Sequence, residues 1–67
     1  KLFIDLTEFS NKKVNISITN LSGKKINNFI VQGSEVAVLD VSKYNSGIYL
    51  IRIEQRKKKT LIRFIKN

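Results

Sequence analysis

The feature that most constrains this chain is an alternation of apolar and polar residues with a period of two. Val14, Ile16 and Ile18 are separated by single polar residues, as in a strand that has one face in a core and the other in solvent. A helix would instead place its apolar residues three and four positions apart. The pattern therefore predicts a chain built from β-strands.

Six strands are predicted from this alternation and from the polar segments between them. They span residues 2–7, 14–19, 26–32, 35–41, 48–54 and 59–66. The register of the third is left open, because Phe29, Ile30 and Val31 are contiguous, and the fourth has apolar residues on both faces. In the sixth, Leu61 and Ile65 lie on one face and Ile62 and Phe64 on the other.

The segments between the strands have the composition of turns. Residues 20–23, 32–34 and 45–47 each contain a glycine, and 55–58 is a polar hairpin turn. A single helical turn at 42–45 is the one competing interpretation. Since these connections are too short for helical crossovers, neighbouring strands pair antiparallel. We expect an all-β fold, a small antiparallel immunoglobulin-like β-sandwich of about six to seven strands.

The composition limits the classes of protein to which the chain can belong. Its 67 residues suffice for one domain, 1–67, and 42% of them are hydrophobic, too many for a disordered tail. It has no cysteine, so no disulfide supports the core. No apolar run reaches the length of about 20 residues that a membrane-spanning helix needs. Because Lys1 is not an initiator methionine, we expect the domain to be cut from a longer protein.

The sequence offers no catalytic apparatus. Histidine and cysteine are both absent, and the five acidic residues are dispersed, so neither a nucleophile with a base nor a metal site is predicted. A calcium site at Asp5, Glu8 or Asp40 is the alternative to solvated carboxylates, and no short motif supports it. We therefore expect no enzyme activity, no catalytic residue, no metal and no cofactor.

The charge is strongly basic, with 13 Lys and Arg against five Asp and Glu, or +8 net. Basic residues cluster at Arg56–Lys59 and at the pairs 12–13 and 24–25. They are interpreted either as solvated turns and edge-blocking lysines or as an anion-binding end of the sandwich. The aromatic residues are scattered, which favours core packing over a stacking platform for single-stranded nucleic acid.

Three stretches together carry a family resemblance. Residues 39–53 combine apolar-Asp-apolar-Ser at Leu39–Ser42 with Gly47-x-Tyr49 and an alternating strand. Residues 14–26 give a strand followed by a turn with Gly23, and 60–67 is a basic strand close to the end of the sequence. This order resembles the type A C-terminal sorting domains of cargo proteins of the bacterial type IX secretion system. Tyr44 departs from the pattern, because the family usually has Leu there.

The motif residues also have folding roles that follow from their chemistry. Gly47 allows a backbone conformation that a β-carbon would oppose. The ring of Tyr49 is apolar and its hydroxyl can reach a loop carbonyl. Asp40 and Ser42 can bond to nearby backbone N–H groups and fix a turn, and Gly23 is suited to positive φ.

The resemblance implies a recognition function. The domain would direct a cargo across the outer membrane, passing through the periplasm, and the cargo would end secreted or at the cell surface. A sortase-like peptidase would remove the domain. The implied partners are translocon or shuttle components and an upstream cargo domain to which this chain, a monomer, is covalently joined. The residues expected to bind partners are Arg56, Lys57, Lys58, Lys59, Arg63 and Lys66.

Two other functions remain open on the sequence. One is an accessory immunoglobulin-like adhesion or carbohydrate-binding module, for which tryptophan is missing and aromatic residues are few. The other is a nucleic-acid binder, which only the +8 charge suggests and which would be non-specific and salt-sensitive.

Overall fold

All six predicted strands are present in the computed structural model, which describes residues 1–67 and contains no helix. A membrane-crossing helix of sufficient length and apolar character is accordingly absent. The strands are β1 (Leu2–Asp5), β2 (Lys13–Asn20), β3 (Lys25–Gln32), β4 (Val36–Leu39), β5 (Gly47–Gln55) and β6 (Lys58–Lys66).

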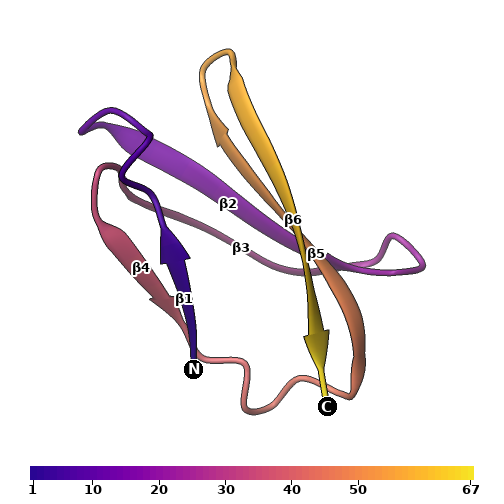
Figure 1. Cartoon of the computed structure of the whole chain (residues 1–67). Coiled ribbons are helices and arrows are strands. Elements are labelled where there is room, and N and C mark those ends of the chain that lie inside the picture. Colours follow the sequence, from indigo (N-terminus) through magenta and orange to yellow (C-terminus); the bar gives the residue numbers. More distant parts are fainter.

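The strands form two sheets in which every pairing is antiparallel, as predicted. One sheet has the order β3-β2-β5-β6 and the other consists of β1 and β4. The chain crosses between the sheets after β1, after β3 and after β4, so that β5 returns beside β2 (Figure 1). The architecture is a small all-β sandwich with one four-stranded and one two-stranded layer.

The period-two alternation of the sequence becomes the core of the fold. Val14, Ile16 and Ile18 of β2 lie beside Tyr49, Ile51 and Ile53 of β5, and all six side chains are buried. The rest of the buried core is Ile4, Leu6, Phe9 and Leu39. Full burial of such a side chain contributes about 1.5–3 kcal/mol, and the two central strands of the larger sheet supply more than half of the set.

Pairing settles the register of β3, which the sequence left open. Phe29 lies opposite Ile16 and Val31 opposite Val14, so both face the core. Ile30, between them, is 64% exposed on the outer face. The contiguous apolar run thus belongs to two different faces of an edge strand.

The predicted fourth strand is longer than the observed β4, which ends at Leu39. Leu39 is buried, whereas Val36 and Val38 point outward and are exposed. The strand stops because the carboxylate of Asp40 accepts a hydrogen bond from the Ser42 N–H at 3.0 Å, and such side-chain bonds compete with a strand ladder.

The structure settles two turns. The helical turn at 42–45, the competing interpretation, is absent, and Tyr44 N–H instead donates to the Val41 carbonyl in a tight turn. The hairpin turn predicted at 55–58 is narrower, with only Arg56 and Lys57 between paired strands. Lys58 is therefore a strand residue, because the pairing of β5 with β6 extends to the last position before the turn.

The first strand was predicted to reach residue 7, but β1 ends at Asp5, whose carboxylate accepts the Thr7 N–H. The segment between β1 and β2 nevertheless packs into the core. Leu6 is fully buried and Phe9 is 4% exposed. Gly33 lies directly beneath this segment, where an added β-carbon would stand 2.0 Å from the Ser10 carbonyl oxygen. Its N–H donates to the Lys12 carbonyl, so the requirement for glycine here comes from close approach.

Candidate functional site

The motif that carries the resemblance forms one local structure at the start of β5. Asp40 Oδ1 accepts the Ser42 N–H, and the Tyr49 hydroxyl donates to the Asn45 carbonyl at 2.6 Å. Gly47 begins the strand with a φ of 152°, a conformation that side chains other than glycine rarely adopt. The folding roles predicted for Asp40, Gly47 and Tyr49 are therefore confirmed.

Two exposed turns hold their carboxylates in the charged form. The backbone N–H of Ser42, and then its side chain, lower the pKa of Asp40 below its ordinary value. Thr7 lowers the pKa of Asp5 in the same way, first through its N–H. Hydrogen bonds to a carboxylate favour its ionised state, so both turns are best held when these acids are ionised.

An aromatic row links the motif to β6. Tyr49 stacks on Phe64, its cross-strand partner, with ring centroids 5.2 Å apart, and the tilted ring of Tyr44 packs against Tyr49 at the same separation. The Tyr44 hydroxyl is buried and has no hydrogen-bond partner. This is the position at which the family usually has Leu, and an apolar side chain would leave no unpaired polar group there.

The turn between β2 and β3 follows the predicted role of Gly23, whose φ is 91°. The sequence did not indicate the part played by Asn20. Its Oδ1 accepts hydrogen bonds from the N–H groups of Ser22 and Lys24. Asn20 thereby satisfies the turn's backbone donors, as amide side chains commonly do in turns.

The basic run at the β5–β6 hairpin is divided between different environments. Arg56 and Lys57 form the exposed tip. Lys58 Nζ reaches back to the Glu8 carbonyl at 2.6 Å and lies 5.1 Å from the centre of the Phe9 ring. Lys58, one of the residues predicted to bind partners, therefore already makes contacts within the domain.

The other predicted binding residues are distributed along β6. Lys59 is opposite Glu54 and 3.7 Å from its carboxylate. Arg63 is opposite Leu50, and Lys66 is opposite Gly47. Because side chains alternate along a strand, Lys59 and Arg63 project from the outer face and Lys66 from the core face. The six predicted residues thus follow the hairpin and one sheet edge without forming a compact patch.

Gln55, which the sequence placed in a turn, is a clamp that sequence reasoning missed. Its Oε1 accepts hydrogen bonds from the N–H and the hydroxyl of Ser10, at 3.0 and 3.1 Å. Its Nε2 donates to the carbonyls of Ser10 and Lys12, at 2.9 and 3.3 Å. With Lys58, it ties the segment after β1 to the hairpin, through contacts between residues more than 40 positions apart.

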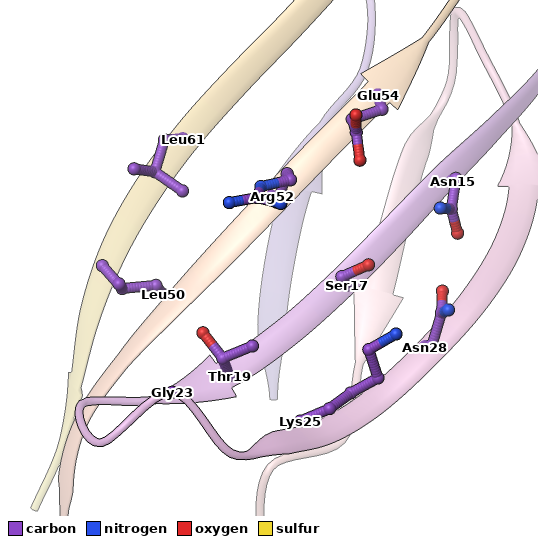
Figure 2. Close-up of a pocket in the computed structure, with 10 residues that line it drawn as sticks. All are labelled: Asn15, Ser17, Thr19, Gly23, Lys25, Asn28, Leu50, Arg52, Glu54 and Leu61. Carbon is purple, nitrogen blue, oxygen red and sulfur yellow. The ribbon is translucent and has the colours of Figure 1, made fainter.

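A polar hollow of about 510 Å³ lies on the outer face of the larger sheet. Figure 2 shows its lining, in which Asn15, Ser17 and Thr19 of β2 stand between Asn28 of β3 and Arg52 of β5. Amides and hydroxyls dominate, with Leu50 and Leu61 at the β5–β6 side. The hollow offers hydrogen bonds but no aromatic surface.

No group of three or more acidic, histidine or cysteine side chains comes close enough to hold a metal ion. The alternative calcium site therefore has no cluster to support it. Asp5 and Asp40 are instead used in their own turns.

Comparison with known families identifies the relatives of this chain. The model of the secretion system C-terminal sorting domain matches residues 1–67, the whole sequence. The chain belongs to this family, the sorting domains of type IX secretion. The search of curated proteins and the search of solved structures each gave no significant match.

The membership gives the local structure at β5 a context. In this sorting domain, the segment that leads into β5 is fixed by hydrogen bonds of Asp40 and Tyr49, and Gly47 begins the strand. Their hydrogen bonds stay inside the chain, so these residues shape the domain. Of the six basic residues predicted to bind partners, Arg56, Lys57 and Arg63 are exposed and make no hydrogen bond or ion pair within the chain.

Proposed function

We propose that this domain carries a covalently attached cargo across the outer membrane and is then removed by a sortase-like peptidase. In this proposal the domain acts as a ligand and a substrate, without enzyme activity of its own. The cargo passes through the periplasm and ends at the cell surface or in the medium. The observation that carries the proposal is the match of residues 1–67 to the sorting-domain family.

The proposal assigns recognition by the translocon or shuttle components to the basic hairpin and to β6. Arg56 and Lys57 are exposed at the tip and make no hydrogen bond or ion pair with the rest of the chain, while Arg63 is exposed on the outer face. Charged groups of this kind increase the rate of encounter with an acidic surface and its specificity. Lys58 and Lys59 are less available to a partner, because the ammonium group of Lys58 donates to the Glu8 backbone carbonyl and that of Lys59 lies beside the Glu54 carboxylate.

Secretion of a fusion protein tests the sorting role. Residues 1–67 are joined to a fluorescent protein that folds in the periplasm, in a bacterium that has a type IX system. We expect fluorescence in the medium or at the cell surface. A matched fusion lacking 59–67 loses β6 and should stay in the periplasm. Retention of the complete fusion, or secretion of both, contradicts the proposal.

Removal of the domain is tested on the same secreted fusion. Mass spectrometry of the product should show a chain that ends before residue 1 or within the first residues of the domain. In a strain without the sortase-like peptidase, the product should keep all of 1–67. A product that carries the intact domain in both strains would exclude cleavage, whatever the result for secretion.

The polar hollow supports a second candidate function, binding of a carbohydrate by an adhesion module. Asn15, Asn28, Arg52 and Glu54 present amide, guanidinium and carboxylate groups to the same space, and such groups hydrogen-bond sugar hydroxyls. A glycan array at low and moderate salt tests this. Saturable, salt-resistant binding that Asn28→Ala removes would favour this function.

A further inference from the structure

The free edge of β6 exposes backbone groups that have no partner in the chain. β6 is the last strand of the larger sheet, paired only with β5. Its turn has two residues, so Gln55 and Lys58 form a hydrogen-bonded pair. Bonded and non-bonded pairs alternate along antiparallel strands. The N–H and C=O groups of four residues therefore point away from β5: Lys59, Leu61, Arg63 and Ile65.

No other segment covers these groups. The backbone hydrogen bonds outside the strand ladders involve no residue of β6. The register with β5 runs without interruption from Gly47↔Lys66 to Gln55↔Lys58, so no bulge twists the edge away. A regular open edge of this length is a template for pairing with another strand.

The side chains of β6 are apolar enough to stabilise such a pairing. Leu61 and Ile65 are 60% and 62% exposed on the outer face. Ile62 faces the core side, opposite the buried Ile51, yet remains 39% exposed. The core therefore covers Phe64 but leaves Ile62 partly open, and one more strand would cover Ile62.

The charge of β6 decides which strand fits. It contains Lys58, Lys59, Arg63 and Lys66 and no acidic residue. A second copy of β6 paired antiparallel about Ile62 would place Lys58 opposite Lys66, and like charges directly opposite each other are destabilising. The complementary strand alternates acidic with apolar residues, so that its carboxylates lie on the outer face beside Lys59 and Arg63 and its apolar residues on the core face beside Ile62.

We propose that the free edge of β6 binds an extended, acidic and apolar strand of a partner protein, which becomes the next strand of the four-stranded sheet. This inference rests on the proposed function for the source of the strand, a component of the export machinery. It adds the mode of recognition, strand addition at a defined edge.

Amide hydrogen exchange of the isolated chain 1–67 tests the edge directly. The probe is an eight-residue capped peptide that alternates Glu and Val, and the control peptide alternates Lys and Val. With the Glu peptide, the four outward amides of β6 should exchange at least about tenfold more slowly at saturation. The amides of β3 should not change, and the Lys peptide should have no effect. The protected positions, every second residue, are the signature of a paired strand.

Other outcomes of this measurement overturn the inference. Equal protection by the Lys peptide excludes recognition by charge. If the Glu peptide leaves the exchange rates of the β6 amides unchanged, or slows exchange only at Arg56 and Lys57, strand addition is excluded. A dimer of the free chain whose interface protects β6 would show that a second copy occupies the edge.

A pair of variants separates the backbone from the side chain. Leu61→Pro removes an outward N–H without removing a bond to β5, a substitution that edge strands tolerate. Leu61→Ala keeps the N–H. We expect the Glu peptide to bind Leu61→Ala and to bind Leu61→Pro at least about tenfold more weakly, a loss of 1.4 kcal/mol. Equal affinity for the two folded variants contradicts strand addition. If Leu61→Pro does not fold, the exchange pattern of the wild-type chain remains decisive.

A second variant tests the charge, and the secretion assay keeps the two proposals apart. Lys59→Glu with Arg63→Glu, two substitutions on the outer face, should reverse the preference between the Glu and the Lys peptides. If the peptide binds β6 but the fusion with residues 1–67 stays in the periplasm, the sorting proposal fails and the binding edge stands. If the fusion is secreted and no strand binds β6, the edge inference fails and the sorting proposal stands.

Discussion

The two edges of the larger sheet differ in how they meet solvent. At β3 the pairing with β2 is broken by an irregularity between Ile18 and Thr19, and the Asn28 N–H is capped by Asn27 Oδ1 at 2.8 Å. At β6 the register is continuous, and no side chain caps an outward backbone group. β3 carries one lysine, whereas β6 has four basic residues. Thus β3 is interrupted by a bulge and has one capped N–H, whereas β6 is protected only by charge.

The two modes of edge protection, a bulge with a cap at β3 and positive charge at β6, have different consequences. A bulge and a local cap block every incoming strand. Positive charge blocks another basic strand and attracts an acidic one. An edge guarded by charge alone is therefore selective, as a recognition surface needs to be.

The anchored end of β3 should be the most sensitive point. In Gly33→Ala the new β-carbon would meet the Ser10 carbonyl oxygen at 2.0 Å, and neither backbone segment can move freely. We expect a loss of about 3 kcal/mol in the free energy of unfolding, measured by urea denaturation. Gly23→Ala meets no atom within 4 Å and should lose only about 1 kcal/mol through its positive φ. Equal losses would show that close packing at Gly33 is not the cause.

The second largest loss of stability is expected from the Gln55 clamp beside the β5–β6 hairpin. Gln55→Ala removes four hydrogen bonds to Ser10 and Lys12, and we expect a loss of about 1–2 kcal/mol in the free energy of unfolding. Thermal or urea unfolding gives the value. The exposed neighbour Lys57→Ala is the control and should be unchanged. A neutral Gln55→Ala would mean that water replaces the clamp without cost.

The aromatic row behind β6 should respond differently at its two hydroxyls. Tyr49→Phe removes the bond to the Asn45 carbonyl and should lower the free energy of unfolding by about 1 kcal/mol. Tyr44→Phe removes a buried hydroxyl without a partner and should be neutral or stabilising. Each variant lacks one hydroxyl oxygen of the wild-type chain, so their urea midpoints can be compared directly. A larger loss of stability in Tyr44→Phe than in Tyr49→Phe would contradict the hydrogen bonding described for the two hydroxyls.

The cap on β3 should matter for exchange more than for stability. Asn27→Ala frees the Asn28 N–H, and we expect at most about 0.5 kcal/mol of destabilisation at this exposed site. Amide exchange at Asn28 should become faster, towards the rates of the outward amides of β6. An unchanged rate would mean that the side-chain cap does not distinguish the two edges.

The smallest effect is expected from the exposed turn that leads into β5. Because the pKa of Asp40 is lowered from 3.8 by the Ser42 N–H, its stabilising contribution is present above pH 3.8 and is lost as the pH falls through the lowered value. The unfolding free energy of Asp40→Asn should therefore fall less on acidification than that of the wild-type chain. Parallel pH profiles would show that this turn does not respond to ionisation.

Much of the fold could be predicted, because the patterns that specify strands and turns involve residues close together in the sequence. The alternation at Val14–Ile18 and Ile51–Ile53 specifies both strand and face, and the pairing places these residues in the core. The family motif was also accessible, since the partners of Asp40 and Tyr49 lie two and four positions away. The predicted lengths of β1 and β4 were wrong, because each strand ends at or before an aspartate whose carboxylate accepts a backbone N–H two positions on.

The binding residues were harder to predict from the sequence. Arg56–Lys59 is a single basic run in the sequence, but the hairpin sends Lys58 to Glu8 and Phe9 and Lys59 to Glu54. Side chains that alternate on a strand separate neighbours onto opposite faces. The basic run in the sequence therefore suggested a more compact patch of positive charge than the folded hairpin presents.

The strands, the inward faces of β2 and β5, the glycine turns and the family could be read from the sequence, since each depends on residues within a few positions of one another. The inward face of β3, the contacts by which Gln55 and Lys58 hold the segment after β1, the close approach of Gly33 to Ser10 and the open edge at β6 came from the folded chain. The reason is that strand order and long-range contact arise when distant segments pair, and a local pattern of apolar residues does not specify which segments become neighbours.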